Sequence, residues 1–560
     1  VLFRRENAAG TTQEGKIMKR KAVAAVLTAV MVASMFTGCG SDKGSSSAKS
    51  TSAASAANDT VDEDGKVNGI MYQEGLPLVD EGDYTFSIFC DDSSESGEFI
   101  MLDEFKKQTN VDVDLKIYPY ETATERLNLD LNSGDYADVI GGWTLSDNAI
   151  LTYGVNQGVF IPLEDYFEKY CPNISAILDL PGVREKMTAP DGHIYTIPYV
   201  CADSTVGYSP YINTKWLENV GMSMPTTTDE FEAVLKAFKE QDANGNGDAS
   251  DEIPFSTDPN NKHIEAMAGY FGLPMNKLGI AIQNEKVVYG GVSDTYREFL
   301  SWFHKLYAEG LVDVELYTQD SSTWEGKGNQ DLYGVSIAYG SGEFTGIPAA
   351  EERGDFDSMP VLNTDKDGIW LRDTEGFSVY RTQAVITNKA EHPEIICRWF
   401  DNAFALENGI GCNRGPVGVI VNKEDDGYHA IDTTTLSEED QEKYSWGNLW
   451  PQSLPKYLPV DFEFVEEHPM YDEKKATEEA YEANLTKEII PSYWIDLDKI
   501  DTFSDTNTAI KDFFEQQQAQ FVCGELDIDN DADWQAYVDG MYSLGLEDWV
   551  ATQGIEEIAK

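Results

Sequence analysis

The apolar residues after residue 83 recur with two different periods, one typical of strands and one typical of helices. Apolar and polar residues alternate strictly over residues 111–117, which predicts a strand. Residues 98–108 place three apolar side chains on one face of a helix. The pattern as a whole predicts strands over 84–89, 111–117 and 137–140 and helices over 98–108 and 122–131. This order predicts a parallel sheet covered by helices, with a ligand at the carboxyl ends of its strands.

A second run of alternating elements follows. Thr227 and Glu230 have the spacing of a helix capping box, and the apolar residues after them recur at helical spacing. Further elements are predicted as extended chain over 195–211, a helix over 295–308, strands over 332–339 and 377–386, a helix over 393–406, and helices in roughly the last 60 residues. We expect an α/β fold of two lobes joined by extended crossings. Each lobe should be a mainly parallel sheet flanked by helices, with extra C-terminal helices.

The N-terminal region is predicted to be an export signal followed by an anchor. Met18-Lys19-Arg20-Lys21 precedes an apolar run over 22–35, which is the layout of a secretory signal peptide and is too short to remain as a membrane-spanning helix. The run ends in Phe36-Thr37-Gly38-Cys39, which resembles a bacterial lipobox in which Cys39 receives a lipid. An ordinary signal peptide with an incidental Cys is the alternative. Residues 40–58, rich in Ser, Ala and Lys, are expected to form a flexible tether.

The chain is strongly acidic, and removal of the signal would increase its acidity. Its 560 residues carry 41 basic and 99 acidic side chains, a net charge of −58. Residues 1–38 hold six of the basic and two of the acidic residues, which leaves 35 and 97 and a net charge of −62. This charge excludes nucleic-acid binding through a broad basic surface and argues against membrane contact other than through the anchor. It favours a neutral ligand over a polyuronate, although a local anion site stays possible.

Residues 242–254 carry the sharpest chemical motif. Side-chain oxygens stand at alternate positions before the turn residue Gly247, and Ca²⁺ takes about 6–8 oxygen ligands from loops of this kind. An EF-hand would place Glu where Ile253 stands, so Asp251 and Glu252 are expected to close the site and Asp248 to bind through its carbonyl. We predict a structural Ca²⁺ held by Asp242, Asn244, Asn246, Asp248, Asp251 and Glu252. A solvated Asn-Gly turn is the alternative.

No pattern of catalytic residues stands out in the sequence. The six cysteines after Cys39 are scattered, and we expect most of them to be buried free thiols. The six histidines show no metal-binding spacing, and the motifs G-x-S-x-G, H-E-x-x-H and the P-loop do not occur. We therefore expect a protein that is not an enzyme. A secreted glycoside hydrolase stays open, because its two carboxylates cannot be picked out among so many acids.

Several short motifs occur in a fixed order along the chain. They are D-G-H-I-Y-T-I-P at 191–198, N-T-K-W-L at 213–217, P-T-T-T-D-E-F at 225–231, the loop at 242–254, and Q-F-V-C-G at 520–524 followed by Trp534, Tyr537 and L-G-L at 544–546. In this order, and with the lipobox, they resemble the large family-1 extracellular solute-binding lipoproteins of bacterial ABC importers, in the branch that includes alginate-binding proteins. The calcium loop departs from the family form by one extra residue before its Asp-Glu pair.

The resemblance implies a two-lobed, periplasmic-binding-protein-like fold of type II that closes on its ligand by a hinge motion. It implies capture of an oligosaccharide and delivery to the permease subunits of an importer, by a lipid-anchored monomer at the outer face of the cell membrane. A peptide or another solute on the same scaffold is the alternative. The expected divisions are upstream residues and signal peptide over 1–38, lipidated Cys and linker over 39–82, a first lobe over 83–195 and 376–455, and a second lobe over 196–375 and 456–560.

Sugars are held by aromatic faces and planar polar groups, so aromatic residues in loops and at strand ends are the candidates for ligand contact. Trp143 is an example, because it follows two glycines at the end of a predicted strand. The complete set of candidate ligand-binding residues is Trp143, Tyr208, Tyr339, Phe344, Trp370, Arg414, Trp446 and Trp450.

Overall fold

The computed structural model describes residues 59–92, 98–258, 263–346, 354–431, 433–460, 462, 464–465 and 469–559. The predicted signal peptide, Cys39 and the tether through residue 58 lie outside these described residues. Among the described residues, no helix is both long and apolar enough to span a bilayer.

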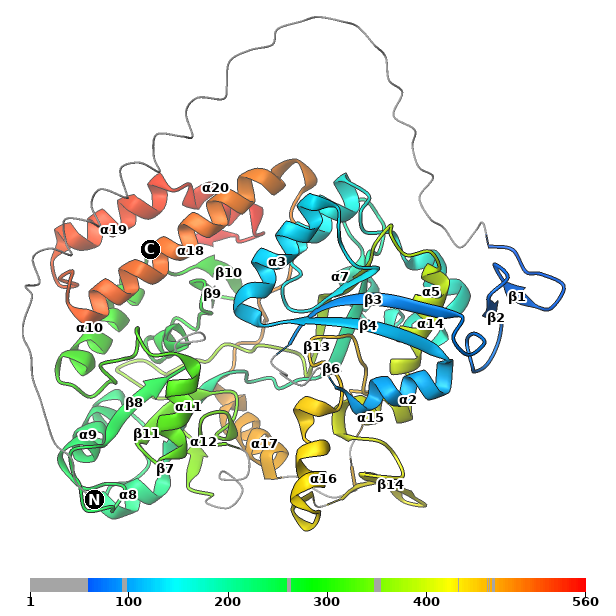
Figure 1. Ribbon diagram of the computed structural model, residues 1–560. Coiled ribbons are helices and arrows are strands. Elements are labelled where there is room, and N and C mark those ends of the chain that lie inside the picture. The colour runs from blue at the N-terminus through cyan, green and yellow to red at the C-terminus, as the bar shows by residue number, and fades with distance from the viewer. Residues whose placement is uncertain are drawn as a thin grey trace, which may run out of the picture. The chain divides into compact units, whose positions relative to one another are not determined.

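Five strands form the first sheet, called sheet one, in the spatial order β4-β3-β5-β13-β6. Figure 1 labels β4, β3, β13 and β6 of this sheet. The strands are β3 (Tyr84–Asp91), β4 (Val111–Tyr118), β5 (Val139–Gly141), β6 (Thr196–Ala202) and β13 (Phe377–Ile386). Strand β3 pairs in parallel with β4 and β5, as predicted. Strand β13 pairs antiparallel with both β5 and β6, so the sheet is mixed and the prediction of a mainly parallel sheet is wrong here. The cause is that β13 returns to this sheet from the other half of the chain, without the helical crossover that a parallel neighbour needs.

Helices pack on sheet one and bury its apolar side chains. They are α2 (Ile100–Thr109), α3 (Tyr120–Ser133), α4 (Asp147–Ala149) with the π-helical turn Ile150–Asn156, α5 (Glu164–Tyr170), α6 (Pro172–Leu178), α7 (Val183–Met187), α14 (Pro393–Ala403) and α15 (Leu406–Arg414). Trp399 of α14 meets Phe86 of β3 and Phe105 of α2 edge to face, with ring centroids 5.3 and 5.4 Å away. Such contacts between distant parts of the chain hold the helices to the sheet.

Residues 59–82 are packed against this half of the molecule. The short strands β1 (Lys66–Val67) and β2 (Met71–Tyr72) form a hairpin. Its apolar side chains, with those of Leu78 and Val79, belong to the sheet-one core and are at most 1% exposed. Arg398 of α14 donates hydrogen bonds to two carbonyls of this segment. The prediction of a linker over 39–82 is therefore wrong for residues 59–82, because these apolar side chains find a surface to pack on.

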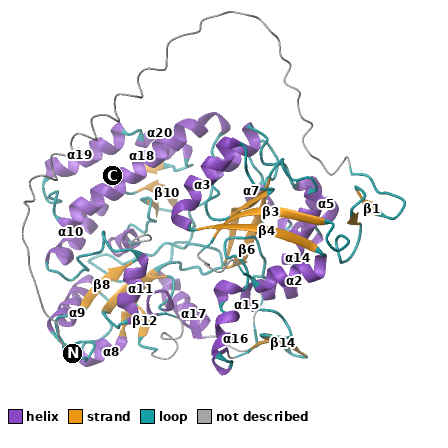
Figure 2. Ribbon diagram, viewed as in Figure 1, coloured by secondary structure: helices purple, strands orange, loops and turns teal. Residues whose placement is uncertain are grey.

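Four strands form sheet two, in the order β12-β7-β11-β8. Figure 2 labels its two edge strands, β12 and β8. The strands are β7 (Ser209–Asn213), β8 (Ile253–Thr257), β11 (Tyr333–Ala338) and β12 (Phe356–Ser358). Only β11 and β8 pair in parallel, while β7 pairs antiparallel with β11 and β12. Sheet two is thus also mixed and not mainly parallel.

The helices around sheet two are α8 (Thr214–Val220), α9 (Thr228–Glu240), α10 (Asp294–Ala308), α11 (Ser321–Asn329), α12 (Gly342–Thr345) and α17 (Pro469–Tyr481). The predicted helix start at Thr227 is confirmed, because its hydroxyl accepts a hydrogen bond from the Glu230 backbone N–H at 3.2 Å. The Glu230 carboxylate bonds the backbone N–H and hydroxyl of Thr226 instead of Thr227. This shift by one residue still satisfies a donor just before the helix.

The C-terminal part of the chain extends the core of sheet two. Helices α18 (Ile500–Cys523), α19 (Asp531–Ser543) and α20 (Leu546–Thr552) confirm the predicted C-terminal helices. A small sheet joins β9 (Ile280–Gln283), β10 (Lys286–Tyr289) and β16 (Glu557–Ile558), so the C-terminal strand pairs with residues about 270 positions earlier. One apolar cluster runs from sheet two into these helices. Among the described residues, the other strands and α-helix are the hairpin β14 (Val421–Glu424) and β15 (Gly427–Ala430), and α16 (Glu438–Lys443).

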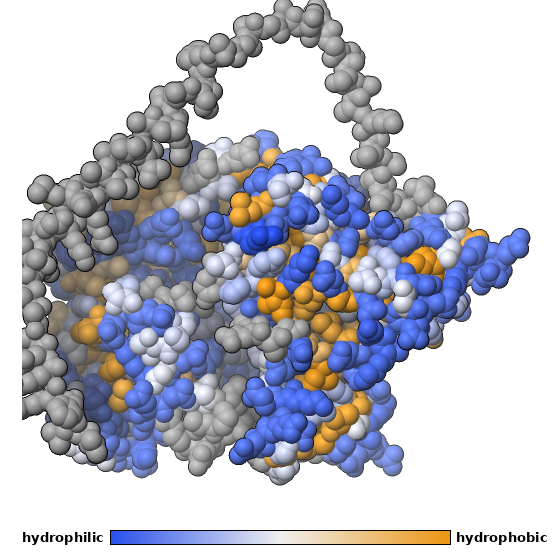
Figure 3. Space-filling model, in the orientation of Figure 1, coloured by the Kyte–Doolittle hydropathy of each residue, from blue (hydrophilic) through white to orange (hydrophobic). Residues whose placement is uncertain are grey.

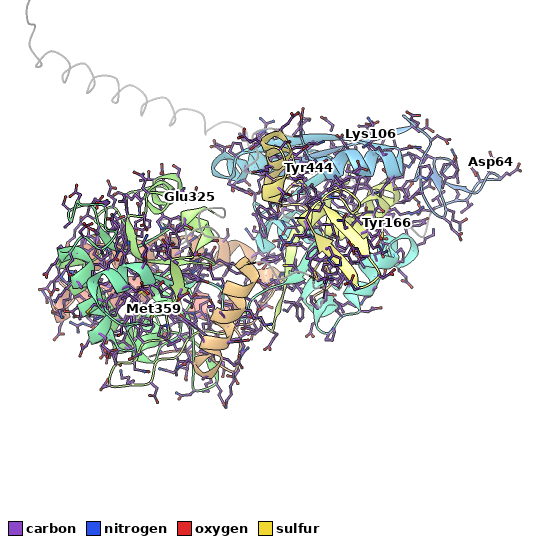
Figure 4. The ribbon with its side chains drawn as sticks, turned by 90° about the horizontal axis from the view of Figure 1, so that it is seen from below. Asp64, Lys106, Tyr166, Glu325, Met359 and Tyr444 are labelled. Atoms are coloured by element: carbon purple, nitrogen blue, oxygen red, sulfur yellow. The ribbon has the colours of Figure 1, made fainter. Side chains whose placement is uncertain are left out.

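The chain passes between the two sheets at residues 203–208, which join β6 to β7, and at 359–376, which join β12 to β13. Figure 4 shows the two groups of side chains, with Lys106 and Tyr166 labelled in one and Glu325 and Met359 in the other. The predicted lobe boundaries need correction. Strand β6 lies in sheet one although residues 196–375 were assigned to the second lobe, because it pairs with β13. Part of 456–560 also packs on sheet one, because Ile495 and Ile500 lie in a core with β3 and β5 side chains.

Hydrophilic residues cover most of the face drawn in Figure 3, with apolar patches between them.

Candidate functional site

Three of the predicted ligand-contact rings are buried in hydrophobic cores. Trp450 is 0% exposed and stacks on Trp399, with ring centroids 5.7 Å apart. Trp370 is 1% exposed and meets Tyr481 edge to face at 5.6 Å, and Phe344 is 0% exposed. A ring enclosed by protein offers no face to a sugar, so the prediction of ligand contact is corrected for these three residues.

Trp143 begins a row of rings on sheet one that we call the aromatic wall. Trp143 is 45% exposed and meets Tyr380 of β13 edge to face at 5.2 Å. Tyr380 in turn stacks on Tyr199 of β6, with centroids 5.6 Å apart and planes 17° apart. Tyr199 and Tyr380 are not among the residues that the sequence predicts for ligand contact. The available signal was their position in predicted extended chain, which does not tell which face a residue occupies until the register with a partner strand is known.

The loop that carries Trp143 is held in place from beneath. The buried Asp91 carboxylate at the end of β3 accepts hydrogen bonds from the backbone N–H groups of Trp143 at 3.0 Å and Thr144 at 2.6 Å. Gly142 has a φ of 135°, and a Cβ there would lie 2.3 Å from an Asp91 oxygen. Only glycine therefore permits this turn. Burial raises the pKa of Asp91, while the two N–H groups favour its charged form.

Asp203, in the first crossing, joins side chains of the two sheets. Its Oδ1 accepts a hydrogen bond from the Tyr339 hydroxyl at 3.0 Å, at the end of β11. Its Oδ2 accepts from the hydroxyls of Ser378 at 2.5 Å and Tyr380 at 3.2 Å, both on β13. Tyr339 was predicted as a site residue and lies here. Asp203 was missed, because a single Asp among 99 acids carries no signal in the sequence.

Tyr208 lies on the sheet-two side of the same crossing. Its ring stacks on His263 with centroids 3.9 Å apart and meets Tyr339 at 6.2 Å. Burial lowers the pKa of His263 to about 4, so the imidazole is neutral at pH 7. The structure thus brings together the predicted residues Tyr208 and Tyr339 and connects them, through Asp203, to the aromatic wall.

A buried lysine lies behind the other end of the aromatic wall. The Lys456 ammonium is 5.3 Å from the ring centroid of Tyr199 and 5.7 Å from that of Trp446, which is 56% exposed. It donates a hydrogen bond to Gln452, and burial lowers its pKa to about 8. Arg414 is half-buried close enough to Tyr199 to interact with it electrostatically, and burial lowers the pKa of Arg414. The predicted residues Trp446 and Arg414 therefore lie at this end of the site.

Carboxylates outnumber cations around the two crossings. The ammonium of Lys474, on α17, donates hydrogen bonds to the carbonyls of Gly207 and Tyr339. Four carboxylates lie close enough to act on it electrostatically, those of Asp203, Glu343, Asp373 and Glu478. Burial lowers the pKa of Lys474 to about 8 and raises that of Asp373 to about 6. A neutral or partly protonated network at this junction is more easily buried than a fully charged one.

The predicted calcium loop folds into a curl of side-chain oxygens between α9 and β8. Asp242 accepts a hydrogen bond from the Gly247 backbone N–H at 3.0 Å, and Asn244 accepts one from Asn246 at 3.0 Å. The Asp251 carboxylate accepts a hydrogen bond from the side-chain amide of Asn246 at 2.7 Å, which ties the middle of the loop to its later part. Glu252 closes the loop by accepting a hydrogen bond from the Ala243 backbone N–H at 2.8 Å.

Two carboxylate oxygens in this loop have no protein partner. Within the part of the chain that the structure describes, Asp242 Oδ1 and Glu252 Oε2 are buried and accept no hydrogen bond. Burial and the nearby Asp251 raise the pKa of Glu252. A hard cation would satisfy both oxygens, so these residues fit the donor set that Ca²⁺ prefers. Asp248 is exposed, and its carboxylate accepts a hydrogen bond from the Ser250 backbone N–H at 3.1 Å.

Another group of donors occurs on the β14–β15 hairpin, where Glu424, Asp426 and His429 bring their donor atoms within 4.8 Å of one another. Both carboxylates are exposed, and His429 already pairs with Asp426 at 2.9 Å. A recess of about 720 Å³ along α10 contains Arg297 and Lys305, which pair with Asp531 and Glu232. Neither place contains one of the aromatic residues predicted for ligand contact.

Comparison with known proteins agrees with this geometry. Residues 93–409 match the family described as bacterial extracellular solute-binding protein. Over 335 residues, the chain is 33% identical to the fructooligosaccharide ABC transporter substrate-binding protein FusA of Streptococcus pneumoniae serotype 4, covering 58% of this chain and 61% of FusA. The chain thus spans about three fifths of this curated relative.

Solved structures extend the similarity. An EF-hand mutant of S. pneumoniae FusA in complex with fructo-nystose matches with a TM-score of 0.72 at 27% identity, covering 84% of this chain and 98% of that one. The alginate-binding protein AlgQ2 without calcium ion matches with a TM-score of 0.68 at 22% identity, covering 86% and 99%, which shows a shared two-lobed fold. The family match spans more than half of the chain and includes the aromatic wall, Asp203 and the calcium loop. The chain therefore belongs to the bacterial extracellular solute-binding protein family.

Proposed function

We propose that this protein captures an oligosaccharide between its two sheets and delivers it to the permease of an ABC importer. The observation that carries the proposal is the aromatic wall, in which exposed Trp143 is fixed by Tyr380 and Tyr199 beside a network of hydroxyls and carboxylates. Aromatic faces pack on the C–H faces of sugar rings, while fixed polar groups bond their hydroxyls. The relationship to FusA, whose name includes fructooligosaccharide, supports this class of ligand.

The proposal also includes the location of the protein, the charge of its ligand and a bound metal ion. Cys39 carries a lipid that anchors the chain, as a monomer, to the outer face of the cell membrane, and residues 40–58 serve as the tether. The ligand is a neutral oligosaccharide, and the protein binds it without turnover. A structural Ca²⁺ is held by Asp242, Asn244, Asn246, Asp248, Asp251 and Glu252. Support for the ion comes from the unpartnered oxygens of Asp242 and Glu252 and from the EF-hand named for the FusA mutant.

A saccharide panel tests the binding function. Kestose, maltotriose, cellotriose, trigalacturonate and two short peptides would be titrated while intrinsic tryptophan fluorescence is followed. We expect a saturable change with a neutral saccharide, because exposed Trp143 and Trp446 lie in the site. Saturation by peptides alone would contradict the carbohydrate assignment, and release of reducing ends during incubation would identify a glycoside hydrolase instead.

Removal of calcium is expected to destabilise the part of the protein that contains sheet two. A chelator should lower the melting temperature by several degrees, because an ion bound only to the folded state stabilises it by mass action. Asp242→Asn combined with Glu252→Gln should melt at the lower temperature and should not respond to the chelator. The matched control is Asp527→Asn, an acid outside the loop, which should keep the full response. An unchanged melt of the unmodified protein in chelator would rule out a stabilising ion.

A further inference from the structure

We propose that Asp203 selects neutral oligosaccharides and rejects those that carry a carboxylate, because it presents a fixed negative charge where the two sheets meet. The proposal rests on the binding function proposed above and assigns its ligand selectivity to one residue.

Asp203 cannot turn away from the site without breaking several hydrogen bonds. Its Oδ1 accepts from Tyr339 at 3.0 Å and from the Ser204 backbone N–H at 2.9 Å. Its Oδ2 accepts from Ser378 at 2.5 Å and Tyr380 at 3.2 Å. The side chain is only partly buried. A sugar that rests on the aromatic wall would therefore meet a carboxylate whose position is set from both sheets.

No cation neutralises Asp203 directly. Within the described part of the chain, no Lys or Arg forms an ion pair with it, and its partners are hydroxyls and one backbone N–H. Lys474 acts on Asp203 only electrostatically, because its ammonium bonds two backbone carbonyls and also interacts with the carboxylates of Glu343, Asp373 and Glu478. The summed charge of Asp203, Lys474 and these three carboxylates is therefore negative even when Lys474 is protonated.

The cations at the other end of the aromatic wall do not offset this charge for a ligand. Lys456 is 1% exposed and lies behind the rings of Tyr199 and Trp446. Arg414 is half-buried and has other interactions within the protein. Lys456 is therefore closed to a ligand by burial, and Arg414 is already engaged by the protein.

Selectivity against carboxylated ligands depends on a charge close to the ligand and not on the net charge of the whole chain. At physiological ionic strength, charges more than about 8 Å from a ligand are largely screened, so the net charge of the chain has little influence once the ligand is in contact. A like charge within a few ångströms, in a site partly shielded from water, is screened much less. Rejection of carboxylated ligands should therefore depend on Asp203 far more than on any other single surface acid.

The test compares each neutral trisaccharide with a carboxylated form of the same molecule. Whichever of kestose, maltotriose and cellotriose saturates the unmodified protein would be used beside its derivative with one terminal primary alcohol oxidised to a carboxylate. Calorimetry at pH 7 should show at least about 10-fold tighter binding of the neutral form. In Asp203→Asn, which keeps the size of the side chain, the ratio of the affinity for the neutral form to the affinity for the carboxylated form should fall at least about 5-fold. The matched control is Asp512→Asn on α18, an exposed acid, which makes the same change in net charge and should leave the ratio unchanged.

A second variant and a salt series keep the test decisive if Asp203→Asn folds poorly. Asp203→Ser removes the charge and retains a hydroxyl, and it should lower the ratio in the same direction. In the unmodified protein, the ratio should shrink as salt rises from about 0.05 to about 0.5 M. Equal affinity for both forms in the unmodified protein, or a ratio unchanged in both variants while neutral binding persists, overturns the role of Asp203 alone. Absence of any saccharide binding to the unmodified protein overturns the binding function, and the selectivity with it.

Discussion

Replacing Trp143 and Trp446 together by alanine is expected to weaken oligosaccharide binding at least about 100-fold. These two tryptophans are 45% and 56% exposed, whereas Trp450 and Trp370 are buried, so they are the indole faces available to a ligand in this region. Each ring packs against a neighbouring side chain. Trp143 contacts the ring of Tyr380, and Trp446 contacts the ammonium of Lys456. Aromatic side chains that are held in this way usually carry a large part of a binding free energy, about 2 kcal/mol or more each.

Calorimetric titration with the responding trisaccharide would measure this loss, because fluorescence would change with the removal of the tryptophans themselves. The melting temperature should stay close to that of the unmodified protein, since neither ring belongs to a core. Tyr542→Ala provides the control, because Tyr542 is 42% exposed on α19, away from the aromatic wall. Affinity retained within about threefold in the double variant would place the ligand elsewhere.

Replacing Trp450 by alanine is expected to lower the free energy of unfolding by about 3–5 kcal/mol. The ring is 0% exposed and is packed against Trp399 at 5.7 Å and Phe105 at 5.0 Å, so its removal leaves a cavity that the sheet-one core cannot fill. Urea denaturation would measure the loss. Trp450→Phe, which retains an aromatic ring, should lose much less stability.

The same variant separates a core role from a ligand role. Below its melting temperature, Trp450→Ala should bind the trisaccharide within about threefold of the unmodified protein, because the ring offers no surface to a ligand. A variant with normal stability and lost affinity would restore the ligand contact that the sequence predicted for Trp450.

Local patterns in the sequence predicted most of the elements. The alternation at 111–117 became β4, and the capping residue Thr227 begins α9, because periodicity and capping depend on neighbours within a few positions. The segment 59–82 was misjudged because its few apolar residues show no period. They are buried by α14, which lies more than 300 residues later.

The candidate calcium loop was also visible in the sequence, because its oxygens are spaced within one short turn. The spacing of these oxygens along the chain did not predict which contacts close the loop. Glu252 accepts a hydrogen bond from Ala243, and its second oxygen stays buried without a partner, as does one oxygen of Asp242. Which two of the six predicted ligands would be left without a partner could not be read from the order of residues.

The sequence by itself determined the α/β class, the family resemblance and the types of side chain that a sugar site needs. It did not separate the tryptophans that serve the core from those that face a ligand, because Trp143 and Trp450 both follow short loop-like segments. Only the tertiary structure decided this. The exposure of a ring depends on which distant helix or strand packs on it, and the pairing of β13 between β5 and β6 placed Tyr199, Tyr380 and Asp203 together although they are up to 181 positions apart in the chain.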